Sequence, residues 1–270
     1  MELVNVRDLK ICCKSVGDGY PLVLIMGFTA NMDWWDPEFI DALSRRFHVL
    51  IFDNRGSGRT VTPDEGNFTC EMFADDTVAL MDAKGIERAN ILGMSMGGLI
   101  AQELAIKYPE RVNNLILACT FCGGQHMIQA SDEVMKIMMD RSGGIDGLFD
   151  RTLKLMFTKD FLNVNENYVN NFKERYFRAP INDANTVRQF IACAKADTFN
   201  RLPEIKNRTL IATGTDDPLI PPQNSRILAE RIPGAKLIEY PGCSHGFISQ
   251  ARDLFIKDLL DFIFLSTTEK

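Results

Sequence analysis

The feature that most constrains this chain is the turn Gly93-Met94-Ser95-Met96-Gly97, which stands between an apolar run and a helical run. Residues 89–92 predict a short buried strand, and residues 98–106 predict a helix that ends before Pro109, because proline cannot continue a helix. A Gly-x-Ser-x-Gly turn from a strand into a helix is so tight that its serine is strained, and side chains in place of the glycines would collide. The hydroxyl of Ser95 is therefore expected above the sheet, beside the first N–H groups and the positive dipole end of the helix.

This pattern alone does not decide between a reactive serine and a glycine-rich turn that only closes a strand–helix unit. With ordinary glycine and serine frequencies, it arises by chance in roughly one chain in ten of this length. The flanking strand and helix favour the reactive serine. The decision depends on whether a base and an acid follow at suitable places.

Apolar runs and helical runs alternate along both ends of the chain. Buried strands are predicted over residues 21–26, 48–52, 115–119, 209–213 and 236–240, after two short strands within residues 3–15. Helices are predicted over residues 37–46, 70–84, 223–232 and 250–264. Strands that are apolar on both faces and alternate with helices predict an α/β fold, with a mostly parallel sheet covered by helices on both faces.

The pattern changes between residues 120 and 200, where strand-like runs give way to helical spacing. We therefore expect an α/β core made of residues 1–120 and 201–270, with residues 121–200 as a helical insertion between two core strands. Ligands of open α/β sheets bind at the carboxyl ends of the strands, and we expect the insertion to lie over those ends. Its methionines and phenylalanines either pack between helices or line an adaptable apolar pocket: Met127, Met135, Met138, Met139, Met156, Phe149 and Phe157.

Three histidines are the candidates for a base. His48 opens a predicted buried strand, which favours a structural role, and His126 at the start of the insertion has no supporting motif. His245 lies in Gly242-Cys243-Ser244-His245-Gly246, a glycine-flanked loop directly after a strand. From such a loop, a neutral imidazole can take the serine proton and later return it to a leaving group.

An imidazole in this role needs a carboxylate that fixes its tautomer. The loop after residues 209–213 contains Asp216 and Asp217, and chemistry alone leaves both open. An Asp-Pro turn that caps the next helix explains one aspartate but does not need two. Ser95, the aspartate pair and His245 each follow a strand, and they occur in the chain order Ser, Asp, His of the α/β-hydrolases.

Composition and charge argue against several other classes of protein. The net charge of −6 and the lack of a basic cluster argue against nucleic-acid binding. No apolar stretch approaches the roughly 20 residues that span a bilayer, and the charged N-terminus lacks a signal-peptide core. The seven cysteines are scattered without the spacing of a zinc site, so we expect no metal and free thiols in a reducing cytoplasm. The oligomeric state is left open, with a homodimer among the alternatives.

Taken together, these motifs resemble the α/β-hydrolase family over nearly the whole chain. The turn around Ser95 matches the family's nucleophile elbow. Gly214-x-x-Asp217-x-x-x-Pro221 matches its acid loop and selects Asp217, and Gly242-x-x-His245 matches its base loop. The resemblance implies a triad of Ser95, His245 and Asp217, a helical cap formed by the insertion, and no cofactor. Asp53-x-Arg55-Gly56-x-Gly58 matches a family turn that is generally structural.

The resemblance also implies an oxyanion hole made of two backbone N–H groups. One belongs to Met96, directly after the nucleophile, and the other to Phe28, in the loop after the third strand. Met26-Gly27-Phe28 stands where many members have His-Gly, which changes the pocket wall but keeps main-chain donors. This loop, together with Met32-Asp33-Trp34-Trp35-Asp36, is similar to that of aclacinomycin methylesterase and related carboxylesterases.

The implied activity is hydrolysis of a small-molecule carboxylic ester through an acyl-serine intermediate. Enol-lactonases, carbon–carbon bond hydrolases and cofactor-free perhydrolases use the same triad and remain alternatives. A small-molecule receptor that retains the triad is an alternative from another class. Haloalkane dehalogenases and epoxide hydrolases carry an aspartate where Ser95 stands, so the sequence argues against them.

Overall fold

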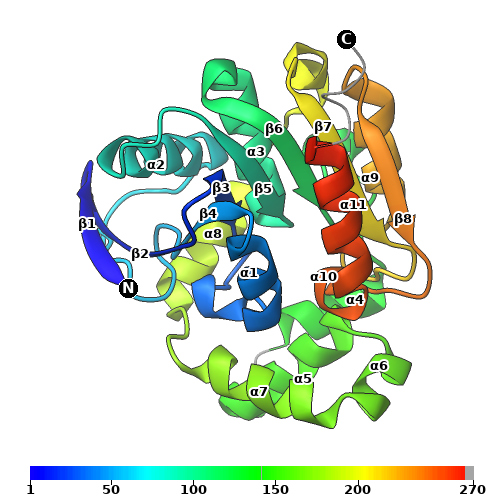
Figure 1. Ribbon diagram of the computed structural model, residues 1–270. Coiled ribbons are helices and arrows are strands. Elements are labelled where there is room, and N and C mark those ends of the chain that lie inside the picture. Colours follow the sequence, from blue (N-terminus) through cyan, green and yellow to red (C-terminus); the bar gives the residue numbers. More distant parts are fainter. Residues whose placement is uncertain (141, 265–270) are drawn as a thin grey trace.

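The computed structural model describes residues 1–140 and 142–264, and its centre is one eight-stranded sheet (Figure 1). The strands lie in the order β1-β2-β4-β3-β5-β6-β7-β8. Their bounds are β1 Glu2–Val6, β2 Leu9–Val16, β3 Tyr20–Ile25, β4 Phe47–Phe52, β5 Ala89–Met94, β6 Val112–Ala118, β7 Arg208–Gly214 and β8 Lys236–Tyr240. The pairs β1–β2 and β2–β4 are antiparallel, and the remaining neighbours are parallel. The predicted mostly parallel sheet is therefore confirmed.

Alternate residues of the central strands enter two separate hydrophobic cores, one on each face of the sheet. In β3, Val23 and Ile25 lie in one core, whereas Leu22 and Leu24 lie in the other. This division follows from the two-residue period of a strand, which points successive side chains to opposite faces. Both faces must then be covered, which explains the continuous apolar runs in the sequence.

Helices cover both of these faces (Figure 1). One core takes side chains from α2 Cys70–Ala83, α3 Met96–Lys107 and α9 Gln223–Arg231, and the other from α1 Pro37–Ser44, α10 Phe247–Gln250 and α11 Arg252–Phe264. The expected single helix over 250–264 is wrong in one detail, because Ala251 leaves helical geometry and separates α10 from α11. Short 3-10 turns occur at η1 Met32–Trp34, η2 Pro109–Arg111, η3 Gly124–His126 and η4 Phe199–Glu204.

In the part of the chain that the structure describes, five α-helices stand between β6 and β7, where the helical insertion is expected. They are α4 Asp132–Met139, α5 Gly144–Met156, α6 Lys159–Val164, α7 Glu166–Phe177 and α8 Asp183–Lys195. Three begin with a side-chain cap, since Ser131, Thr158 and Asn182 each accept a backbone N–H of the first turn. Figure 1 shows α5, α6 and α7 on one side of the sheet layer. The division of the chain at residues 121 and 200 remains a prediction.

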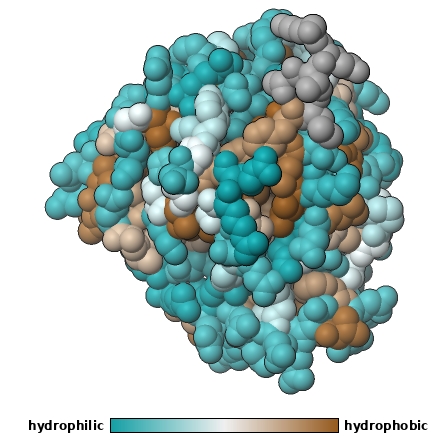
Figure 2. Space-filling view, in the orientation of Figure 1, coloured by the Kyte–Doolittle hydropathy of each residue, from teal (hydrophilic) through white to brown (hydrophobic). Residues whose placement is uncertain are grey.

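The surface is mixed in character. Figure 2 shows a face that is mostly hydrophilic, with hydrophobic side chains in smaller groups between polar ones. Within residues 1–140 and 142–264, no helix combines the length and the apolar character that crossing a membrane requires.

Candidate active site

Ser95 occupies the tight turn between β5 and α3 that the sequence predicts. Its φ is 56°, in the left-handed region that L-residues rarely adopt. A Cβ at Gly93 would overlap the carbonyl oxygen of Gly97, and a Cβ at Gly97 would overlap the carbonyl oxygen of Ile25. The turn is held from the neighbouring strand, since the Ser95 N–H donates to the Ala118 carbonyl at 2.9 Å. Only glycine fits at these two positions, and the strained turn fixes where the hydroxyl stands.

Asp217 and His245 form a buried pair at the ends of the neighbouring strands β7 and β8. The His245 Nδ1 and Asp217 Oδ2 atoms lie 2.7 Å apart, and the two side chains are 3% and 0% exposed. The other carboxylate oxygen, Oδ1, accepts the backbone N–H groups of Leu219 and Ile220, each at 2.9 Å. Both oxygens of the Asp217 carboxylate therefore have hydrogen-bond partners. Because Asp217 binds the imidazole of His245 through Nδ1, the Nε2 atom is available to other groups.

The two aspartates of this loop have different surroundings. Asp216 is exposed, and its carboxylate accepts the hydroxyl of Thr215 at 2.8 Å. Asp217 is buried against His245. The structure therefore places Asp217, and not Asp216, beside the predicted base.

The loop after β3 approaches Ser95 closely. A Cβ on Gly27 would lie 3.0 Å from the Ser95 Cβ and 3.6 Å from its Oγ. Phe28 follows directly, and within the described residues its N–H donates to no protein acceptor. Met96 opens α3, where a helix leaves its first N–H groups unpaired. Both predicted oxyanion donors thus belong to segments that flank the serine.

Gln189 of α8 holds this loop from the insertion, which sequence reasoning missed. It is fully buried, and its Oε1 accepts the N–H of Thr29 at 2.9 Å. Its Nε2 donates to the Arg55 carbonyl at 3.1 Å and to the Ser57 hydroxyl at 2.8 Å. Thr29 has a φ of 60°, so the residue next to Phe28 is strained and held in place by a partner 160 residues away. No local pattern marks a glutamine for this role.

The loop that carries His245 is also tied to the insertion. The Gly246 N–H donates to the Met156 carbonyl at 2.6 Å, and the Ser244 hydroxyl to the Leu155 carbonyl at 3.3 Å. A Cβ on Gly246 would lie 2.5 Å from the ring of Phe157. The carboxyl end of α5 therefore packs directly on the base loop.

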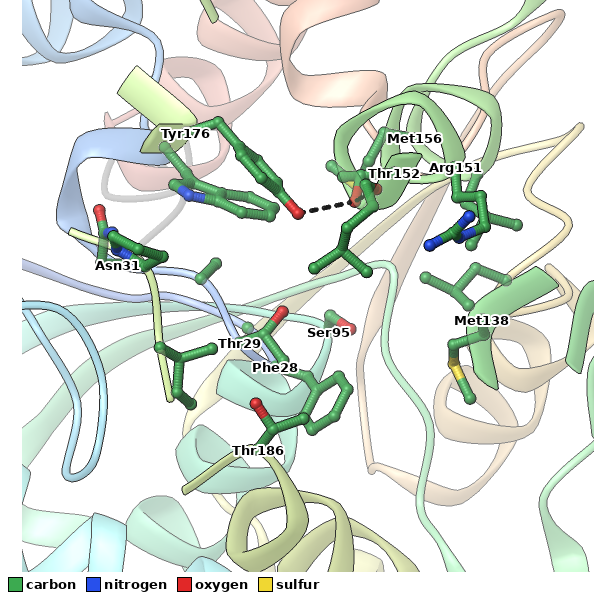
Figure 3. Close-up of a pocket in the computed structure, with 18 of the residues that line it drawn as sticks. Phe28, Thr29, Asn31, Ser95, Met138, Arg151, Thr152, Met156, Tyr176 and Thr186 are labelled. Carbon is green, nitrogen blue, oxygen red and sulfur yellow. Dashed lines mark hydrogen bonds between the residues drawn. The ribbon is translucent and has the colours of Figure 1, made fainter. Parts of the chain in front are cut away.

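Ser95 and His245 line one cavity of about 660 Å³ between the core and the insertion (Figure 3). Its walls are largely apolar and include Phe28, Met138 and Met156. Of the methionines and phenylalanines that sequence analysis left open, these two methionines line the cavity. Phe149 and Phe157 instead pack in an aromatic cluster between the helices of the insertion.

The other two histidines lie outside the described cavity lining. His126 stacks on Phe199 with ring centroids 3.5 Å apart, and His48 stands in β4 with Pro21 as its strand partner. Asp53 is buried and accepts the N–H groups of Met32 and Arg59, each at 2.8 Å, so this carboxylate organises a turn. Burial raises the Asp53 pKa from its ordinary value.

A third side chain, Cys119, lies behind the aspartate–histidine pair. Its Sγ, an Asp217 oxygen and a His245 ring nitrogen all lie within 4.8 Å of one another. Burial, with the nearby Asp217 carboxylate, raises the pKa of this thiol well above its ordinary value. Metal binding needs the thiolate, which such an environment disfavours, and Asp217 and His245 already bind each other. These three residues therefore fit a buried packing thiol beside a hydrogen-bonded aspartate–histidine pair better than a metal centre.

The fold and the arrangement of these residues define a hydrolase. The chain belongs to the family described as the alpha/beta hydrolase fold, whose model matches residues 20–251. It is 30% identical over 265 residues to a candidate carbamate hydrolase, RutD, of Azorhizobium caulinodans, with 97% of this chain and 98% of that protein covered.

Solved structures show the same fold over almost the full chain. The enol-lactonase from Burkholderia xenovorans LB400 is 28% identical with a TM-score of 0.82, over 96% of this chain and 98% of that one. The meta-cleavage product hydrolase CumD from Pseudomonas fluorescens IP01 is 23% identical with a TM-score of 0.84, over 98% of both chains. The predicted α/β-hydrolase fold is thus confirmed.

Proposed function

We propose that this protein hydrolyses small-molecule carboxylic esters through an acyl-enzyme intermediate on Ser95. The observation that carries the proposal is the buried Asp217–His245 pair, at 2.7 Å, whose histidine lines the same cavity as Ser95. An acid, a base and a nucleophile on three loops at one edge of a sheet are the parts that serine acyl transfer requires.

In the proposed first half-reaction, the Ser95 Oγ attacks the ester carbonyl carbon while His245 takes the hydroxyl proton. Asp217 accepts the Nδ1–H of the resulting imidazolium and stabilises its charge. The N–H groups of Phe28 and Met96 bind the oxyanion. The carbon–oxygen bond to the alcohol then breaks, and His245 gives the proton to the departing oxygen. These steps use protein groups alone.

In the second half-reaction, His245 removes a proton from water as the water oxygen attacks the acyl carbon. The bond between Ser95 Oγ and the acyl carbon breaks, and the proton returns to Ser95. The products are one carboxylic acid and one alcohol for each ester and water consumed.

A lactone is a cyclic ester, so a second candidate activity is lactone hydrolysis by the same residues. The likeness to a lactonase of 28% identity favours this candidate. The loop similar to that of aclacinomycin methylesterase supports open-chain esters. Carbamate, carbon–carbon and peracid chemistry, and a receptor that retains the triad, are outcomes that the experiment must separate.

The experiment compares the wild type with Ser95→Ala on p-nitrophenyl esters, γ- and δ-lactones, carbamates and vinylogous diketones. We expect steady turnover of esters by the wild type and its loss in Ser95→Ala, with both proteins folded. A fluorophosphonate probe should label Ser95 in the intact protein, as located by mass spectrometry. Ester turnover that survives Ser95→Ala would refute the mechanism, and one burst without further turnover would favour the receptor.

Two further proposals accompany this function. The helical insertion, residues 121–200, acts as a cap over the site, supported by the insertion residues that line the cavity. The protein works in a reducing cytoplasm, supported by seven cysteines that are all free.

A further inference from the structure

We propose that Arg151 selects substrates that carry a carboxylate, so that the preferred ester or lactone is anionic. The inference rests on the proposed ester chemistry and adds the class of substrate. It concerns the side of the cavity formed by the insertion, where no part of the predicted triad or oxyanion hole lies.

Arg151 is a cation in a largely apolar wall. Within residues 1–140 and 142–264, it is the one lysine or arginine that lines the cavity shared by Ser95 and His245. Figure 3 shows it beside Thr152 and Met156 of α5, across the pocket from Asn31. Its side chain is 14% exposed, so its charge is largely removed from water.

The Arg151 guanidinium is held in place but incompletely paired. Nη2 donates to the Ser142 carbonyl at 2.7 Å, and Nη1 lies 3.3 Å from the Asp140 carboxylate. Among residues 1–140 and 142–264, the buried Nε finds no hydrogen-bond partner. Asp140 is 44% exposed, and ion pairs with solvent-exposed acids contribute little. The pair therefore orients Arg151 without fully offsetting its desolvation.

A substrate carboxylate in the cavity would supply the missing interaction. Hydrogen bonds between guanidinium and carboxylate are charge-assisted, and they strengthen where water is excluded. The acidic side chain of the described lining is Asp183, which is exposed at the first turn of α8 and so remains hydrated. The largely buried charge of Arg151 therefore contributes more to the electrostatic potential inside the cavity than the hydrated charge of Asp183 does.

The test uses p-nitrophenyl half-esters of glutaric, adipic and pimelic acid. Each is compared with its primary-carboxamide isostere, which has nearly the same size and shape without the charge. We expect the wild type to prefer at least one acid over its isostere by about tenfold or more in kcat/KM, the range of a hydrogen bond to a charged group. The chain length with the largest preference measures the reach from Ser95 to Arg151. Because Arg151 could lie on the alcohol side of the scissile bond, 4-carboxyphenyl acetate and its primary carboxamide form a second pair.

Arg151→Met should reduce the acid-to-isostere ratio to about one, and Arg151→Lys should give an intermediate ratio. Asp140→Asn should raise the ratio, because it removes the competing carboxylate. Lys154→Met is the matched control: Lys154 is an exposed cation of the same helix outside the described cavity lining, and its loss should not change the ratio. Equal ratios in the wild type and Arg151→Met would overturn the inference while leaving ester hydrolysis intact.

A binding measurement separates this inference from the proposed function. Adipate dianion should raise the Tm of Ser95→Ala and should not raise that of the Ser95→Ala, Arg151→Met double variant. If no ester is hydrolysed at all, ester chemistry fails, and the adipate result alone then supports or refutes the anion site.

Discussion

His245 and Asp217 form one buried hydrogen-bonded pair, with Nδ1 and Oδ2 2.7 Å apart, although 28 residues separate them in the chain. They come from the loops after β7 and β8, which are adjacent parallel strands. Because the carboxyl ends of parallel strands meet at one edge of a sheet, the two loops are neighbours in space. The pair stands beside a cavity that Ser95 also lines.

Asp217→Asn should lower kcat by roughly 10³–10⁴-fold, because an amide cannot stabilise the imidazolium or enforce the required tautomer. Asp216→Asn is the matched control, since the neighbouring aspartate is exposed and hydrogen-bonded to Thr215. Steady-state kinetics on the best p-nitrophenyl ester measures both variants. Equal losses in the two variants would show that the observed pair is not the one used in catalysis.

Gln189→Leu should lower kcat about tenfold with a smaller change in KM. The substitution removes the acceptor that holds the Thr29 N–H, so the adjacent Phe28 donor is no longer fixed for the oxyanion. Gln129→Leu, at an exposed position, is the control and should not alter kcat. An unchanged kcat in a folded Gln189→Leu protein would show that Gln189 does not position the oxyanion donor and has only a structural role.

Gly246→Ala should destabilise the protein by about 1–3 kcal/mol, the usual cost of overpacking. Its new Cβ would meet the Phe157 ring at 2.5 Å and the Met156 carbonyl oxygen at 2.8 Å. Urea denaturation measures the change in the free energy of unfolding. Adding Phe157→Leu should restore part of the lost stability, because the smaller side chain makes room for the new Cβ. If stability does not recover, the contact with the Phe157 ring is not the source of the strain.

Asp8→Asn should destabilise the folded state at pH 7, with a penalty that disappears in acid. Hydrogen bonds from the buried Arg55 guanidinium lower the Asp8 pKa to about 2 from an ordinary 3.8. A lowered folded-state pKa means that the ionised form stabilises the fold above about pH 4, and that this contribution is lost as the pH falls toward 2. Because the Asp8 side chain is 51% exposed, solvent and salt reduce the effect.

Urea midpoints of the wild type and Asp8→Asn, taken between pH 7 and pH 3, measure this difference. The two curves should converge as the pH falls. Asp18→Asn, at an exposed turn, should follow the wild type throughout. If the difference between the two urea midpoints does not change with pH, then packing around Asp8, and not its charge, stabilises the contact with Arg55.

Much of the fold was predictable because its signals are local. The apolar runs at residues 21–26 and 209–213 predict buried strands through their composition alone, and both strands form within two residues of those bounds. The glycines around Ser95 predict a tight turn, and the structure leaves no room for a Cβ at either Gly93 or Gly97. The break at Ala251 was missed, since its helical composition gives no stop signal.

The surroundings of the candidate site were less predictable because they depend on distant packing. Gln189 lies 160 residues from Thr29, and it acts on that loop only because α8 packs beside it. The contact between Gly246 and the end of α5 is equally non-local. Met138 faces the cavity while Phe149 packs between helices, although both occupy apolar positions of amphipathic helices.

The sequence by itself determined the strand–helix order, the strained serine turn and the loops that hold an acid and a base, because turn chemistry and hydrophobic periodicity act over a few residues. Chemistry alone left the adjacent Asp216 and Asp217 as equal candidates, and the resemblance to the family's acid loop selected Asp217. In the structure, Asp217 is buried against His245 and Asp216 is exposed. Tertiary structure alone decided which insertion side chains line the cavity, Arg151 among them. The reason is that the angle at which helices pack on a sheet depends on contacts between distant segments, which local spacing does not record.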